Sequence, residues 1–158
     1  MPELAATATS ETVMAFDFGE QRIGVAIGET LLGEARALAT VAEAANDRRF
    51  AAIGKLIETW HPARLVVGLP RHLDDSAHAF AARCERFANQ LAGRYRLPVE
   101  LADERYSSAV AESAMGGRGL NVRKNKARLD AEAAAVILQA WFDQRHAITS
   151  TAHATLGH

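Results

Sequence analysis

Acidic residues at three places in this sequence follow or flank apolar segments, where a carboxylate is costly to bury unless it is paired or binds a cation. Asp17 lies near the end of the apolar run TVMAFDF, and Gly19 leaves space beside it for a ligand to approach the backbone. Asp103 and Glu104 follow the run PVELA, and Asp130 lies beside an apolar helical stripe. Taken singly, each also fits an ordinary acid of a turn or a first helical turn.

If these acids lie close together in space, they could bind a divalent cation. Three carboxylates repel one another, and a divalent cation relieves that repulsion. Oxygen ligands with few histidines favour Mg²⁺ or Mn²⁺ over zinc. Two such ions can activate water and stabilise the leaving oxygen in phosphodiester hydrolysis. Adjacent residues of an extended strand point to opposite faces, so we expect one member of the pair Asp103 and Glu104 to face the site.

A basic segment between Arg105 and Arg128 contrasts with the chain's net charge of −1. Glu112 is the one acid in that span, whose basic residues are Arg105, Arg118, Arg123, Lys124, Lys126 and Arg128. Charge alone favours a solvated loop. Beside a cluster of metal-binding acids, however, such a segment is suited to hold a nucleic-acid backbone through its phosphates.

The apolar periodicity predicts which elements position these residues. Strands are expected at 12–18, 22–28, 35–42, 64–69 and 98–102. Helices are expected at 46–60, from 75 or 76 to about 95, from 107 or 108 to about 115, and at 126–145, with Asn46 as the first N-cap. This order predicts an α/β fold with a five-stranded mixed sheet, in which a three-strand antiparallel meander joins two parallel strands and helices flank the sheet. It is also the element order of ribonuclease H-like domains.

Apolar stripes at helical spacing predict the buried face of each long helix. The predicted stripes are Phe50, Ile53, Leu56, Ile57 and Trp60; Phe80, Cys84, Phe87, Leu91 and Tyr95; and Leu129, Ala133, Val136, Ile137, Ala140 and Trp141. Cys84 is interpreted as a packing residue, because it lies within such a stripe. Beside Asp130, the small residues Ala133 and Ala134 are expected to let the last helix approach the sheet.

Length and composition predict a single globular domain over 12–146, between disordered arms at 1–11 and 147–158. No apolar run approaches the ~20 residues that cross a bilayer, and the first residues lack the features of a secretory signal. A lone cysteine suits a reducing compartment. We therefore expect a cytoplasmic protein with no membrane partner.

Four blocks of the sequence resemble the YqgF family, also called RuvX. They are AFDFGEQRIGVAIGE (15–29), LVVGLPRHLDDS (65–76), LADERYSSAVAE (101–112) and KARLDAEAAAVILQAW (126–141). The family is similar to ribonuclease H and to the RuvC resolvases. The resemblance implies a metal-dependent endonuclease that processes the 5′ end of precursor 16S rRNA in ribosome biogenesis. Some members are associated with cleavage of four-way DNA junctions.

The resemblance also implies roles for individual residues. It favours Glu104 over Asp103, so that the predicted catalytic and metal-binding acids are Asp17, Glu104 and Asp130, with Asp103 as an additional candidate ligand. Arg22 and Arg105 match basic positions that contact phosphate or orient carboxylates. The segment 71–75 departs from the Asn- and Gly-rich pattern of the family, so no substrate contacts are inferred for it.

The implied cofactor is Mg²⁺ or Mn²⁺, as two ions. The implied partner is precursor rRNA, with ribosomal particles, or junction DNA, bound by a monomer or a weak homodimer. Three alternatives stay open: a junction resolvase, which must act as a dimer to cut two strands symmetrically; a non-catalytic RNA-binding assembly factor; and a fragment of an actin-like ATPase. The last needs two such domains, which 158 residues cannot supply.

Overall fold

The computed structural model describes residues 10–69, 75–103 and 129–145. Its strands are β1 (Thr12–Asp17), β2 (Ile23–Glu29), β3 (Glu34–Val41), β4 (Arg64–Leu69) and β5 (Val99–Asp103). Two helices, α2 (Asn46–Trp60) and α3 (Asp75–Tyr95), lie between them in sequence. A further helix covers residues 129–145 and is called the 129–145 helix below. None of the helices in the described ranges is long and apolar enough to span a membrane.

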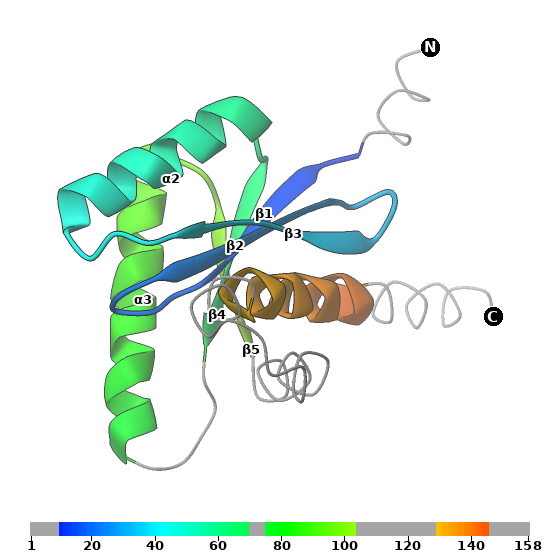
Figure 1. Cartoon of the computed structure of the whole chain (residues 1–158). Helices are drawn as coiled ribbons and strands as arrows, with labels where there is room; N and C mark the ends of the chain where they lie inside the picture. Colours follow the sequence, from blue (N-terminus) through cyan, green and yellow to red (C-terminus); the bar gives the residue numbers. More distant parts are fainter. Residues whose placement is uncertain (1–9, 70–74, 104–128, 146–158) are drawn as a thin grey trace, which may run out of the picture.

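The strands form one mixed sheet with the order β3-β2-β1-β4-β5 (Figure 1). The first three strands make an antiparallel meander, while β4 runs parallel to β1 and β5 parallel to β4. This is the predicted combination of a meander with two parallel strands. β1 lies at the centre because all of its residues from Val13 to Phe16 are apolar and fully buried, as expected for a strand covered on both faces.

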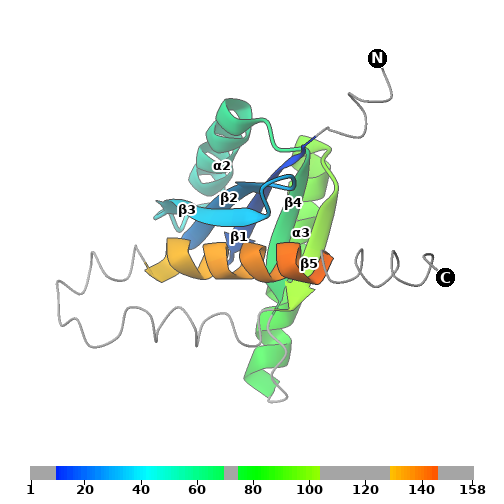
Figure 2. The ribbon, with the colours of Figure 1, turned by 90° about the vertical axis from the view of Figure 1, so that its right-hand side faces the viewer.

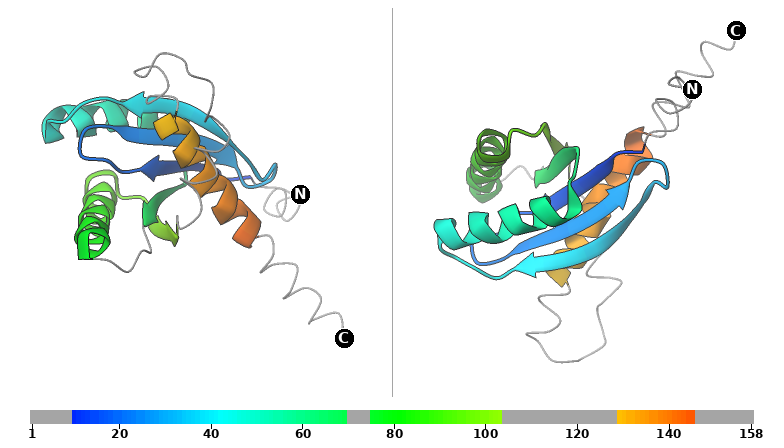
Figure 3. Two further views of the ribbon diagram at one scale, coloured as in Figure 1. Left: turned by 60° about the horizontal axis from the view of Figure 1, so that its bottom comes forward. Right: turned by 90° about the horizontal axis from the view of Figure 1, so that it is seen from above.

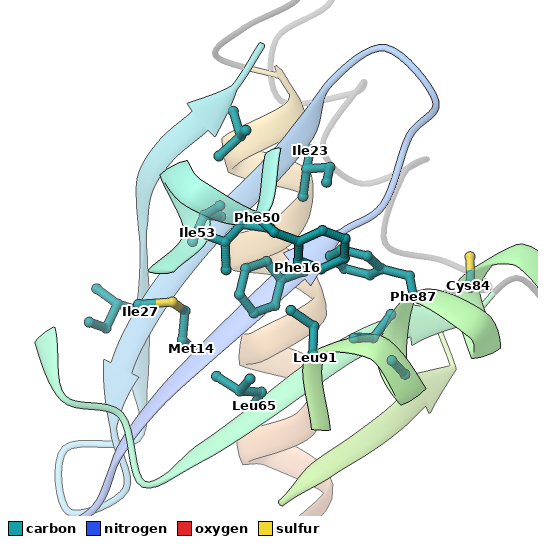
Figure 4. Packing of buried hydrophobic residues seen from close by; sticks show 14 residues of the cluster. Met14, Phe16, Ile23, Ile27, Phe50, Ile53, Leu65, Cys84, Phe87 and Leu91 are labelled. Carbon is teal, nitrogen blue, oxygen red and sulfur yellow. The ribbon is translucent and has the colours of Figure 1, made fainter. Parts of the chain in front are cut away.

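Helices cover both faces of the sheet, with α2 and α3 on one side and the 129–145 helix on the other (Figures 1 and 3). Side chains alternate between the two faces along β1. Met14 and Phe16 belong to the core beneath α2 and α3, whereas Val13 and Ala15 belong to the core beneath the 129–145 helix. Figure 4 shows Phe16, Phe50 and Phe87 meeting in the first core, where the Phe16 and Phe87 rings pack edge to face at 5.8 Å.

The ends of α2 follow the local sequence with two corrections. The prediction of Asn46 as N-cap is wrong: Ala45 occupies that position in an extended conformation and provides no side-chain cap, and Asn46 is already helical. Trp60 was expected on the buried face but is 38% exposed, because it is the last helical residue. The helix stops at His61, which adopts a left-handed conformation before Pro62 and donates its N–H to the Ile57 carbonyl.

The predicted stripes of the other two helices are largely confirmed. Cys84, Phe87 and Leu91 of α3 are buried, and so are Ala133, Ile137 and Trp141 of the 129–145 helix. Ala140 is exposed, contrary to expectation. The buried face of this helix is wider than a single stripe, because it lies across the sheet (Figure 2), and it also includes Ala134, Leu138 and Phe142.

The meander is tied to its neighbours by polar contacts. The Gln139 side chain accepts a hydrogen bond from the Ala35 N–H at 2.9 Å and donates one to the Gly33 carbonyl at 2.8 Å. It therefore fastens the 129–145 helix to the start of β3. On the other side of the hairpin, Ser10 Oγ accepts a hydrogen bond from the Leu31 N–H at 3.0 Å. The predicted helix at 107–115 and the first residues of the predicted last helix lie outside the described residues.

Candidate active site

Asp17 ends the central strand on the face covered by the 129–145 helix. It follows Val13 and Ala15 at a spacing of two, so its position belongs to their face. The residue is partly exposed, whereas the four residues before it are fully buried. In the antiparallel register Asp17 is paired with Gly24 of β2, and opposite residues of such a pair share a face of the sheet.

Gly24 allows the 129–145 helix to lie directly on the strand. A Cβ atom built there would lie 1.8 Å from the Asp130 carbonyl oxygen and 3.0 Å from the Ala131 nitrogen, so no side chain fits. The N-terminal end of the 129–145 helix therefore lies on Gly24. Four residues along β2, a Cβ atom on Gly28 would lie 2.7 Å from Cε2 of Phe142, which marks the other end. The two glycines, with the small residue Ala26 between them on the same face, leave room for the helix to lie close to β2.

Asp17 and Asp130 both lie next to Gly24. Asp17 is the register partner of Gly24, and the Asp130 backbone lies against that same glycine. Two of the three predicted acids, 113 positions apart in the chain, therefore have their backbones next to the same glycine. Ala133 and Ala134, which were expected to allow this approach, are both buried, and the glycines of β2 add to it on the strand side.

Arg22 holds the carboxylate of Asp130. Its Nε donates to Asp130 Oδ2 at 2.6 Å, and the two side chains are 35% and 25% exposed. A charge-assisted hydrogen bond of this length fixes the direction of the carboxylate. Of the two roles that the sequence left open for Arg22, phosphate contact or orientation of a carboxylate, the structure shows an ion pair that orients one.

The turn from Asp17 to Arg22 is held by side chains from α2 and α3. Phe18 packs on Phe87 with ring centroids 4.8 Å apart. Arg83 of α3 forms an ion pair with Glu20, and Arg49 of α2 donates to the Gly19 carbonyl. None of these contacts was anticipated from the sequence, and they attach the Asp17 turn to the opposite layer of helices.

The remaining predicted site residues fall largely outside the described ranges. Asp103 is the last residue of β5 and pairs with Leu69 of β4. The residues that lie outside are Glu104, Arg105, Arg118, Arg123, Lys124, Lys126 and Arg128. Within the described residues, no group of three or more His, Cys, Asp or Glu side chains could by itself hold a metal ion. Asp17 and Asp130 nevertheless offer the hard oxygen donors that Mg²⁺ and Mn²⁺ prefer, so they fit two ligands of such an ion.

Comparison with known proteins places the chain in a family. The family model described as "RuvX: Holliday junction resolvase" matches residues 11–144. The chain belongs to the RuvX family. A relative from Methylobacillus flagellatus, named "Putative pre-16S rRNA nuclease", is 54% identical over 143 residues, which cover 90% of this chain and 97% of the relative. A RuvX relative of the same name from Chromobacterium violaceum is 54% identical over 132 residues, covering 83% and 96%.

Two solved structures share the fold of this RuvX chain. T. thermophilus RuvC in complex with a Holliday junction substrate superposes with a TM-score of 0.51 at 17% identity, covering 87% of this chain and 96% of that one. The yeast mitochondrial Holliday junction resolvase Ydc2 gives a TM-score of 0.50 at 11% identity, covering 82% and 77%. The predicted family and the predicted ribonuclease H-like fold are both confirmed.

Proposed function

We propose that this protein is a metal-dependent endonuclease that hydrolyses phosphodiester bonds in the 5′ leader of precursor 16S rRNA, in the cytoplasm. The observation that carries the proposal is that Asp17 pairs with Gly24 and that the Asp130 backbone lies against the same glycine. Support also comes from the two relatives named "Putative pre-16S rRNA nuclease", which this chain matches over nearly their whole length. The domain that carries this activity is proposed to span 12–146.

Asp17 and Asp130 would hold Mg²⁺ or Mn²⁺, in a site for two ions. When bound, such ions supply an activated water and stabilise the charge on the leaving oxygen. The chain's own contribution is to aim the ligands before a metal arrives. Arg22 holds one oxygen of the Asp130 carboxylate and offsets part of its negative charge, which reduces the repulsion between the two acids when the helix lies on the sheet.

Glu104 is proposed as the third ligand on grounds of strand alternation. Within β5, Ala102 belongs to the core beneath the 129–145 helix, and Glu100 accepts a hydrogen bond from Trp141 of that helix. The next position in this alternating series is 104, one residue past the end of the strand. Position 103 belongs to the other series, so we propose Glu104 rather than Asp103 as the ligand that joins Asp17 and Asp130.

The basic segment is proposed to hold the nucleic-acid backbone next to these acids. It follows β5 and precedes the 129–145 helix, so both of its ends are attached to elements that carry site residues. The proposed phosphate contacts are Arg105, Arg118, Arg123, Lys124, Lys126 and Arg128. Precursor rRNA within ribosomal particles is the proposed substrate and a monomer the proposed active form. Junction DNA, bound by a homodimer, is a second candidate, because the matching family model is described as a junction resolvase.

Side-by-side cleavage assays test the proposal. Purified protein is incubated with Mg²⁺ or Mn²⁺ and either a precursor 16S rRNA 5′ leader or a four-way DNA junction. We expect cleavage of the RNA that falls at least ~10²-fold in Asp17→Asn, because removal of a ligand disables the site. Asp143→Asn is the matched control: it changes an exposed acid of the 129–145 helix and should cleave normally.

The outcomes separate the candidates. Equal background cleavage by the wild-type protein and Asp17→Asn would exclude a nuclease and leave an RNA-binding assembly factor. Cleavage of the junction without cleavage of the RNA would favour the resolvase.

A further inference from the structure

Arg49 is a buried charge that the proposed chemistry does not yet use. The residue is 5% exposed, which is unusual for arginine, and burial lowers the pKa of its guanidinium. The ordinary pKa of arginine is so high that the group nevertheless stays positively charged near neutral pH. A buried cation needs compensating contacts, and its contacts therefore indicate what it is there to hold.

Those contacts are with the main chain of two loops. Arg49 Nε donates to the Glu43 carbonyl at 2.6 Å, and an Nη2 hydrogen bond reaches the Gly19 carbonyl. The guanidinium also lies over the Phe18 ring, 5.3 Å from its centroid. In this way Arg49 joins the start of α2, the β3–α2 connection and the β1–β2 turn. Its planar fork suits two carbonyls in different directions, which a lysine could not satisfy in the same geometry.

The β1–β2 turn that Arg49 holds lies between two residues of the candidate active site. Phe18 and Gly19 directly follow Asp17, and Arg22, which orients Asp130, lies at the other end of the same turn. The backbones of Gly19 and Arg22 also lie close together in this turn, since a Cβ atom at Gly19 would meet the Arg22 carbonyl. A shift at the Gly19 carbonyl would therefore be passed to both Asp17 and Arg22.

We infer that Arg49 is a positioning residue, which holds the β1–β2 turn from the opposite face of the sheet and so fixes the Asp17 carboxylate for metal binding. The inference rests on the proposed function for the identity of the ligand. It assigns to α2 a part in the site that neither the motif nor the position of α2 on the far face suggests. The hydrogen bonds act through the backbone, so Arg49 itself touches neither metal nor substrate.

The test compares Arg49→Lys with Arg94→Lys. Arg94 also lies over a core aromatic ring, 4.1 Å from the Phe50 centroid, but it belongs to the end of α3, away from the turn. Two properties are measured: hydrogen exchange over residues 16–24 in metal-free protein, and Mn²⁺ affinity by titration calorimetry. We expect Arg49→Lys to speed hydrogen exchange in the turn and to weaken Mn²⁺ binding about tenfold or more, the size of effect that loss of a group orienting a metal ligand commonly has.

Arg94→Lys should leave both properties at wild-type values. Wild-type Mn²⁺ affinity in Arg49→Lys would overturn the inference even if the variant were less stable, because a purely structural role predicts that result. Should Arg49→Lys fail to fold, the metal-free wild-type protein still decides: the hydrogen-bonded Arg49 Nε–H must exchange with solvent as slowly as the amides of residues 16–24, and rapid exchange of this Nε–H would overturn the inference. A wild-type protein that binds neither ion would refute the proposed function itself, before any variant is compared.

Discussion

Gly24→Ala is the sharpest test of how the two described acids meet. The added Cβ atom would lie 1.8 Å from the Asp130 carbonyl oxygen, whereas even a close carbon–oxygen contact needs roughly 3.3 Å. The start of the 129–145 helix must therefore move away by about 1.5 Å. The atom in the way belongs to the backbone, so no side-chain rotation relieves the clash.

This displacement should affect both stability and the site. Overpacking of this kind costs about 1–3 kcal/mol of unfolding free energy. A misplacement of about 1 Å in a catalytic group can lower turnover by about 10²-fold, and we expect a similar loss of RNA cleavage together with weaker Mn²⁺ binding. Urea unfolding, Mn²⁺ calorimetry and cleavage of the 5′ leader measure the three effects.

Gly93→Ala is the matched control. A Cβ atom at Gly93, in the last turns of α3, meets nothing within 4 Å. Because alanine is the better helix former, this variant should gain about 0.5–1 kcal/mol and cleave normally. Wild-type stability and Mn²⁺ affinity in Gly24→Ala would refute the reasoning that Asp130 is brought to Asp17 by a close helix–strand approach.

Further variants probe the ion pair, the basic segment and the packing of α3. Arg22→Gln should lower Mn²⁺ affinity by about 10- to 100-fold, measured by calorimetry, because Asp130 loses the group that aims it. Alanine at both Lys124 and Lys126 should weaken RNA binding and flatten its dependence on salt, measured by filter binding at several salt concentrations. Burial raises the pKa of the Tyr95 phenol, partly offset by the charge of Arg94. The neutral phenol is thus favoured in the folded state, and stability should decline as pH rises above ~10; Tyr95→Phe should decline less in alkaline urea titrations.

The fold could largely be predicted from the sequence because its elements have strong local signals. The central strand is an unbroken apolar run, and α3 has an apolar residue every three or four positions. The errors lie where a local signal is weak. Asn46 is a good capping residue type, but the extended conformation that a cap needs occurs at Ala45. Trp60 follows the apolar spacing of α2 but comes too late in the helix to be covered.

The site could be predicted only in part, because its geometry depends on long-range packing. Asp17 was identifiable as an acid at the end of a buried strand. Its meeting with Asp130 depends on Gly24, and a glycine in an apolar strand does not reveal which backbone will pack on it. Arg49 follows another arginine and resembles a solvated helix start, although its spacing of four from Ile53 places it on the buried face.

Mn²⁺ binding by single and double acid variants tests the central claim most directly. Calorimetry is carried out on the wild-type protein, Asp17→Asn, Asp130→Asn and the double variant. Ligands of one locus are not independent, so we expect each single variant to lose most of the Mn²⁺ affinity and the double variant to lose little more. Wild-type Mn²⁺ affinity in Asp130→Asn, or separate and additive losses from the two substitutions, would contradict a shared metal site at Gly24.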